Sequence, residues 1–166
     1  MAIPEPWATE LQQYRAAVGD TTAAKIPTHI TLVPPTEISA ETLEDVETHL
    51  EAAADEVASF SVHLRGTGTF RPVSQVVFVQ VAEGISACER LEAAIRTSRP
   101  SEPLRFPYHP HVTIAHNIDD ASLDRAYNEL SGFECQFTVD RFALYLHDDV
   151  DGWVPRETFD LGPGPR

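Results

Sequence analysis

The chain has 166 residues and an apolar fraction of 42%, which suits one domain with a hydrophobic core and excludes a wholly disordered protein. No apolar run approaches the roughly 20 residues of a membrane-spanning helix, and the first residues lack the basic and apolar stretches of a signal peptide. Twelve basic residues against 26 acidic residues give a formal charge of −14, which disfavours binding to long nucleic acid. We therefore expect a cytoplasmic, monomeric domain that spans residues 1–166.

Hydrophobic spacing predicts two helices in the first third of the chain. Trp7, Leu11, Tyr14 and Val18 recur at helical spacing, so we expect a first helix over about 6–18. Residues 25–33 then form a loop that enters a strand, which Pro34 and Pro35 end. A second helix follows over about 43–57, with Ser39 as its expected N-cap and an acidic, solvated outer face.

The remaining elements alternate between strands and helices. A continuous apolar run at 76–79 indicates a strand covered on both faces. Ser86 and Glu89 suit a capping box at the start of a third helix that ends near Thr97. A fourth helix is expected between Asp119 or Asp120 and Gly132. The other expected elements are strands at 60–69, 75–82, 108–116, 133–147 and 153–161, and a loop at 99–103.

Cys88 and Cys135 are the two cysteines of the chain, and their spacing matches no metal or redox motif. Cys88 falls on the apolar side of a predicted helix, and Cys135 falls in a predicted strand. We expect both thiols to be reduced and at least partly buried.

A weak internal repeat relates the two halves of the chain. Each half contains a His-x-Thr strand, then a helix, then a strand segment that reads Phe-Ser-Val at 60–62 or Phe-Thr-Val at 137–139, and then another strand, at offsets of about 80 residues. The repeat predicts two similar lobes, over 20–82 and 104–161, that each present one H-x-T strand.

The H-x-T segments His29-Ile30-Thr31 and His111-Val112-Thr113 carry the chemistry. With an apolar residue required in the middle and after each motif, two matches are expected by chance in roughly one chain in 200 of this composition. Residues i and i+2 of a strand project to the same face. Each histidine therefore shares a face with its threonine, while the alternating apolar residues enter the core.

Two imidazoles beside one phosphoryl group are suited to acid–base chemistry. A neutral imidazole removes a proton from the attacking hydroxyl or water, and a protonated one supplies a proton to the leaving oxygen. Thr31 and Thr113 can donate hydrogen bonds to the non-bridging oxygens. We therefore predict His29, Thr31, His111 and Thr113 as catalytic residues that need no metal or cofactor.

The stretches 26–34 and 106–115 resemble the two-histidine (2H) phosphoesterase superfamily, and specifically its bacterial 2′-5′ RNA ligase-like group. The resemblance covers nearly the whole chain. It implies a bilobal α+β fold with pseudo-twofold symmetry, in which two antiparallel sheets flank a central cleft and helices lie outside. It also implies metal-free opening of 2′,3′-cyclic phosphates or 2′-5′ phosphodiester transfer, with a small nucleotide-derived molecule or an RNA terminus as substrate. A first strand, common in the group, has only Met1–Ile3 to form it.

Several other residues are candidates for substrate binding. Tyr108 and Phe70 can stack on a base or simply pack in the core. Arg71 can hold a second phosphate because it lies between two predicted strands, and Arg105 is a weaker candidate for the same role. Each of these residues also has an ordinary structural interpretation, as a core aromatic or a surface arginine.

Two alternative functions stay open at the level of sequence. His109 and His111 form a His-x-His pair that can ligate zinc with His29 as a third ligand, which would indicate a metal-dependent hydrolase. The chain can also be a nucleotide- or RNA-end-binding module with little turnover. The sequence does not determine which histidine is the base, or which base the substrate carries.

Overall fold

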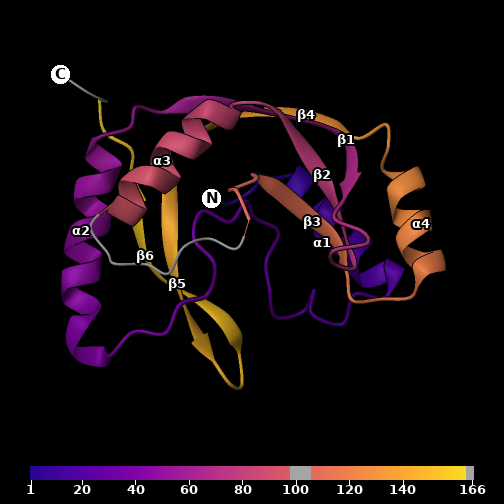
Figure 1. Ribbon diagram of the computed structural model, residues 1–166, viewed down its shortest axis with the longest axis horizontal. Coiled ribbons are helices and arrows are strands. Elements are labelled where there is room, and N and C mark those ends of the chain that lie inside the picture. Colours follow the sequence, from indigo (N-terminus) through magenta and orange to yellow (C-terminus); the bar gives the residue numbers. More distant parts are fainter. Residues whose placement is uncertain (98–105, 164–166) are drawn as a thin grey trace.

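A four-stranded antiparallel sheet forms the centre of the computed structural model, which describes residues 1–97 and 106–163 (Figure 1). Its strands lie in the order β3-β2-β1-β4. The strands are β1 (Phe60–Thr69), β2 (Val76–Glu83), β3 (His111–His116) and β4 (Glu134–Val139). The predicted strands at 60–69 and 75–82 are confirmed to within one residue, and β3 begins directly after Pro110, which cannot donate to a ladder.

One face of this sheet packs on two helices, α1 (Trp7–Val18) and α4 (Asp120–Glu129). In Figure 1, α1 is partly hidden behind β3, and α4 lies at the right of the sheet. Leu11 and Leu123 are fully buried in this interface. Asp119 caps α4 by accepting a hydrogen bond of 3.0 Å from the backbone N–H of Ser122, as expected for a helix N-terminus.

A second, two-stranded sheet consists of β5 (Arg141–Asp148) and β6 (Gly152–Asp160), and β6 packs on helix α2 (Leu43–Asp55). Helix α2 in turn packs on α3 (Ile85–Thr97), and both helices stand at the opposite end of the molecule from α4 (Figure 1). His49 joins the two helices through a contact of 2.7 Å between its Nε2 and the carbonyl oxygen of Ile95. Arg156 of β6 donates to Glu47 of α2 at 2.9 Å.

The α+β class is therefore confirmed, as one curled antiparallel sheet and one small sheet. The central sheet takes β1 and β2 from residues 20–82, and β3 and β4 from residues 104–161. The two predicted halves are thus interleaved in space. Their description as two lobes related by a pseudo-twofold axis stays a prediction.

Three local predictions are wrong. Ser39 precedes a short 3₁₀ helix, η1 (Ala40–Thr42), and its side chain caps no backbone N–H there. Helix α3 begins at Ile85, where the carbonyl of Gly84 accepts from the N–H of Cys88, so Ser86 lies inside the helix and forms no capping box with Glu89. Residues 25–33 contain the expected loop, but the strand expected to follow within them is reduced to isolated bridges at residues 29 and 30.

Other expectations about the chain have clearer outcomes. Cys88 and Cys135 are free and buried, and burial raises the pKa of each thiol to about 11, so both are confirmed as reduced core residues. Met1–Ile3 forms a single bridge, Ala2 with His29, in place of a full strand. The loop predicted at 99–103 and Arg105 lie outside the described residues. No helix in the described part of the chain has the length and apolar character needed to cross a bilayer.

Candidate active site at the paired H-x-T segments

The two H-x-T segments lie side by side, joined by an antiparallel bridge between Ile30 and Val112. In an antiparallel pair, the neighbours of a bridged pair also face each other, so His29 lies opposite Thr113 and Thr31 lies opposite His111. Ile30 and Val112 are both 0% exposed and enter the core. The four polar side chains therefore project together from the other face.

The bridge also sets the separation of the two histidines. They are diagonal neighbours across the pair, and such neighbours lie about 7–8 Å apart, with their Cβ atoms somewhat closer. A space of this size between two imidazoles accommodates one phosphoryl group. The electrostatic coupling of His29 to His111 agrees with this proximity.

Each histidine is oriented by a backbone carbonyl two residues before it. The Nδ1 atom of His29 lies 2.6 Å from the carbonyl oxygen of Pro27, and that of His111 lies 2.7 Å from the carbonyl oxygen of His109. A carbonyl only accepts, so Nδ1 carries the hydrogen in both rings. The Nε2 atoms are thus left to exchange protons, and that of His29 lies 2.9 Å from Oγ1 of Thr31.

Burial lowers the pKa of both histidines, because it removes the imidazolium from water. For His29, the hydrogen bond to the Pro27 carbonyl opposes this lowering of the pKa, while nearby cationic groups such as Arg15 add to it. For His111, the hydrogen bond to the His109 carbonyl opposes the lowering, and the His109 imidazole adds to it. Burial therefore favours the neutral form of both rings, and an anion between them would raise their pKa values again.

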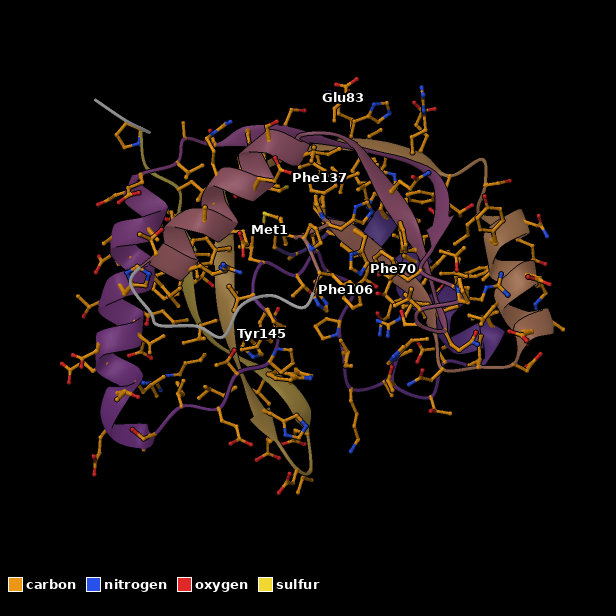
Figure 2. The ribbon with its side chains drawn as sticks, viewed as in Figure 1. Met1, Phe70, Glu83, Phe106, Phe137 and Tyr145 are labelled. Carbon is orange, nitrogen blue, oxygen red and sulfur yellow. The ribbon has the colours of Figure 1, made fainter. Side chains whose placement is uncertain are left out.

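Two aromatic rings support His111. Phe70, labelled in Figure 2, lies at the turn that follows β1. Its ring meets the His111 ring edge-on with centroids 4.9 Å apart. Phe78 of β2 lies 5.1 Å from the same ring. Phe78 was missed in the sequence because it stands within an apolar run that indicates only a buried strand.

A glycine makes room for this aromatic support. Gly68 of β1 is the cross-strand partner of Phe78, and a Cβ atom at this position would lie 2.5 Å from Cε2 of the Phe78 ring. No side chain larger than hydrogen fits there without a shift of the ring. The position of the ring beneath His111 therefore depends on Gly68.

The segment that leads into His29 has little regular structure, and buried polar side chains hold it against α1. Oγ1 of Thr28 donates to Oε1 of Gln12 at 2.7 Å. Arg15 donates to the carbonyl oxygen of Ile26 at 3.0 Å, and it forms a buried ion pair of 3.0 Å with Asp20. The sequence carried a signal for this network, since Arg15 falls between Leu11 and Val18 on the buried side of the helix.

Tyr108 lies at the site as a link between the two segments. Its hydroxyl donates to the carbonyl oxygen of Thr31 at 3.0 Å, and its ring packs against the core. Burial raises its pKa strongly. The contact ties the chain just before His111 to the first H-x-T segment, which suits a positioning role, and stacking of Tyr108 on a base stays a prediction.

Phe70 and Arg71 occupy the same turn but have different surroundings. Phe70 is half-buried against His111, next to the predicted phosphate position. The guanidinium of Arg71 is instead held by α4, at 2.7 Å from Asp124 and 3.7 Å from Asp120. A phosphate contact by Arg71 stays a prediction, and it would require exchange of this ion pair.

The remaining histidines have other environments. His109 is exposed, and its ring stacks on that of His111 with centroids 6.1 Å apart. Within residues 1–97 and 106–163, no three His, Cys, Asp or Glu side chains are grouped so that they could hold a metal ion. The described residues therefore provide no set of ligands for the zinc site of the alternative hypothesis.

Comparisons with known proteins agree on one family. The sequence model described as the 2′-5′ RNA ligase superfamily matches residues 3–151. A Bacillus cytotoxicus protein named "Putative phosphoesterase Bcer98_0945" is 30% identical over 145 residues, which cover 86% of this chain and 84% of that protein. The apo structure of E. coli LigT is similar in fold, with a TM-score of 0.70 at 21% identity over 98% of this chain and 94% of LigT. The LigT structure with 3′-AMP has a TM-score of 0.66 at 19% identity, over 90% of this chain and 92% of LigT.

We predict that both imidazoles titrate below the ordinary histidine pKa of about 6.5 and are Nδ1–H tautomers when neutral. Because the folded pKa values lie below the unfolded ones, these histidines favour the folded state fully above about pH 6.5, and that contribution is lost as the pH falls through the folded pKa values. Imidazole ¹⁵N NMR across a pH titration measures both properties, with the denatured protein as the control. An Nε2–H tautomer at either ring would contradict the assignment.

Replacement of Gly68 tests the aromatic support of His111. We expect Gly68→Ala to lower the free energy of unfolding by about 1–3 kcal/mol and to shift the His111 ring resonances, because the Phe78 ring must move. Urea denaturation and NMR measure the two effects. Gly132→Ala is the matched control, since a Cβ atom there meets no atom within 4 Å. Equal stability of the two variants, with unchanged His111 resonances, would show that the ring does not depend on Gly68.

Proposed function

Because the chain belongs to the 2′-5′ RNA ligase superfamily, we propose that it is a metal-independent phosphodiesterase with two-histidine acid–base catalysis. Its substrates in this proposal are 2′,3′-cyclic or 2′-5′ phosphodiesters of nucleotides or RNA ends. The observation that carries the proposal is the Ile30–Val112 bridge, which directs two imidazoles and two threonine hydroxyls toward one space.

The chemistry follows from the orientation of the rings. One neutral imidazole accepts, at Nε2, a proton from the attacking water while the water oxygen bonds to phosphorus. The bond from phosphorus to the ribose oxygen breaks, and the other imidazole, protonated at Nε2, supplies the proton that this oxygen takes up. The product of a cyclic substrate is a phosphomonoester beside a free hydroxyl. In the reverse direction, the ribose hydroxyl attacks phosphorus and water leaves, so the histidine that acted as the acid accepts the hydroxyl proton and the other histidine supplies a proton to the departing water.

The threonines stabilise the charge that forms during this step. Thr31 and Thr113 lie on the same face as the histidines, where their hydroxyls can donate to the two non-bridging oxygens. Bound phosphate also favours protonation of one imidazole, since a nearby anion raises the pKa of an imidazole. Substrate thus helps to protonate the histidine that acts as the acid.

Nucleotides are the favoured substrate class. LigT, which shares this fold, has been solved with 3′-AMP, ATP and NADP⁺. The formal charge of −14 on the present chain disfavours a long polyanion, because several phosphate contacts would be needed. A small nucleotide, or one RNA terminus held locally by a monomer, is consistent with both observations.

Removal of either histidine tests the enzyme directly. We expect His29→Ala and His111→Ala each to lower turnover of 2′,3′-cyclic nucleotides, 2′-5′ dinucleotides or ADP-ribose cyclic phosphate by about 10²–10⁴-fold. His147→Ala, on the exposed hairpin of β5 and β6, is the matched control. Tight nucleotide binding without turnover by the unaltered protein would instead support a binding module. Loss of activity with a chelator and its recovery with zinc would support the metal-dependent alternative.

The pH dependence of kcat/KM provides an independent test. One histidine must be neutral and the other protonated, so we expect a bell-shaped profile. Because burial lowers both pKa values, the maximum should lie below pH 6.5, and activity should fall as the pH rises toward 8. Steady-state rates over pH 5–9 measure the profile, and a flat profile across this range would contradict the mechanism.

A further inference from the structure

The sheet face that carries His111 continues as a polar surface across β2 to β1. The cross-strand partner of His111 is Gln80, and partners in an antiparallel pair project to the same face. The side-chain amide of Gln80 extends toward β1, where its Nε2 donates to the carbonyl oxygen of Thr67 at 2.9 Å. Its Oε1 is therefore left as an acceptor on this face.

A hollow of about 520 Å³ opens beyond Gln80, in the size range of small-molecule sites. Its walls come from β1, β2, β4 and the turn after α4, and include Arg65, Gly66, Gln80, Ser131, Gly132 and Glu134. Strands in a sheet are about 4.8 Å apart, so the β1 wall is about 10 Å from β3. This is a suitable span for a ribose and a base attached to a phosphate at His111.

The hollow offers a planar guanidinium as a hydrogen-bond donor and side-chain oxygens as acceptors. Arg65 is exposed, and its guanidinium makes no hydrogen bond or ion pair with the part of the chain that the structure describes. Its cross-strand partner Glu134 is held in place by His63, whose Nε2 lies 2.7 Å from Oε1 of that carboxylate. The second carboxylate oxygen, with Oε1 of Gln80, can accept from a ligand.

The glycines leave the floor and rim of the hollow open. Gly66 has a φ of +69° in an irregular part of the β1–β2 register, a conformation that favours glycine. A Cβ atom at Gly132 would meet nothing within 4 Å. A flat group can therefore approach the backbone closely on this side.

We propose that this hollow is the nucleobase subsite of the enzyme, with Arg65 stacked on the base and with Gln80 and Glu134 accepting from its amino edge. The inference rests on the proposed function, and it adds a substrate preference. A base fits better than a second phosphate because Glu134 and Glu83, which both contact His63, would repel an anion. Adenine, cytosine and guanine present amino groups to these acceptors, and uracil does not.

Two variants and two substrates distinguish an effect on base binding from an effect on the catalytic step. Arg65→Ala removes the stacking group, and Gly132→Phe fills the hollow from the opposite wall. We expect each to lower kcat/KM for 2′,3′-cyclic AMP about tenfold, mainly through KM, and to leave hydrolysis of glycerol 1,2-cyclic phosphate, which has no base, unchanged. Arg90→Ala, which removes an exposed arginine of α3, is the charge-matched control and should leave both activities unchanged. The unaltered protein should also prefer cyclic AMP to cyclic UMP.

The outcomes distinguish the subsite from the proposed function. Unchanged kinetics in Arg65→Ala, or equal losses with both substrates, would overturn the subsite. If the unaltered protein hydrolyses neither substrate, the proposed function fails. Calorimetric measurement of the affinities for 3′-AMP and for inorganic phosphate then tests the hollow alone. We expect Arg65→Ala to weaken the binding of 3′-AMP about tenfold and to leave the binding of phosphate unchanged. Arg65 is exposed, so its variant keeps this test valid even if Gly132→Phe does not fold.

Discussion

The antiparallel bridge between Ile30 and Val112 is the interaction on which the candidate site depends. It converts two motifs that are far apart in the chain into neighbouring strands with a defined register. Because side chains alternate along a strand, the burial of these two residues requires His29, Thr31, His111 and Thr113 to face the opposite side. A shift of one residue in either strand would turn the histidine and threonine of that strand into the core.

The two segments are supported in different ways, which explains how a single bridge suffices. His111 begins a paired strand of the central sheet and rests on Phe70 and Phe78. His29 lies outside the named strands, and its approach is held by the hydrogen bonds of Gln12 and Arg15 from α1. Buried polar groups of this kind must all be satisfied to be stable, so the network specifies one conformation of the loop.

The same burial that orders the site also sets its protonation. Both imidazoles are partly buried, which lowers their pKa values, and each has its Nδ1 directed at a carbonyl oxygen, so the neutral rings present outward Nε2 atoms. In the proposed mechanism, a phosphodiester supplies the negative charge that allows one ring to be protonated. Burial of the imidazoles would thus account both for a preference for anionic ligands and for the acid–base chemistry. In the proposed nucleobase subsite, the adjoining polar face around Arg65 and Gln80 offers both hydrogen-bond donors and acceptors, as a nucleoside requires.

The sequence by itself determined the secondary elements and the motif pair, because these depend on local periodicity: the strand at 60–69, the capped helix after Asp119, and the His-x-Thr alternation are all visible within a few residues. Only the tertiary structure decided which strands pair, that the segment at 25–33 keeps two bridges instead of a strand, and that Arg71 is held by α4. It also revealed Phe78 and Gly68 beneath His111, and Arg15 behind His29. These features depend on contacts between residues distant in the chain, for which local spacing carries no information.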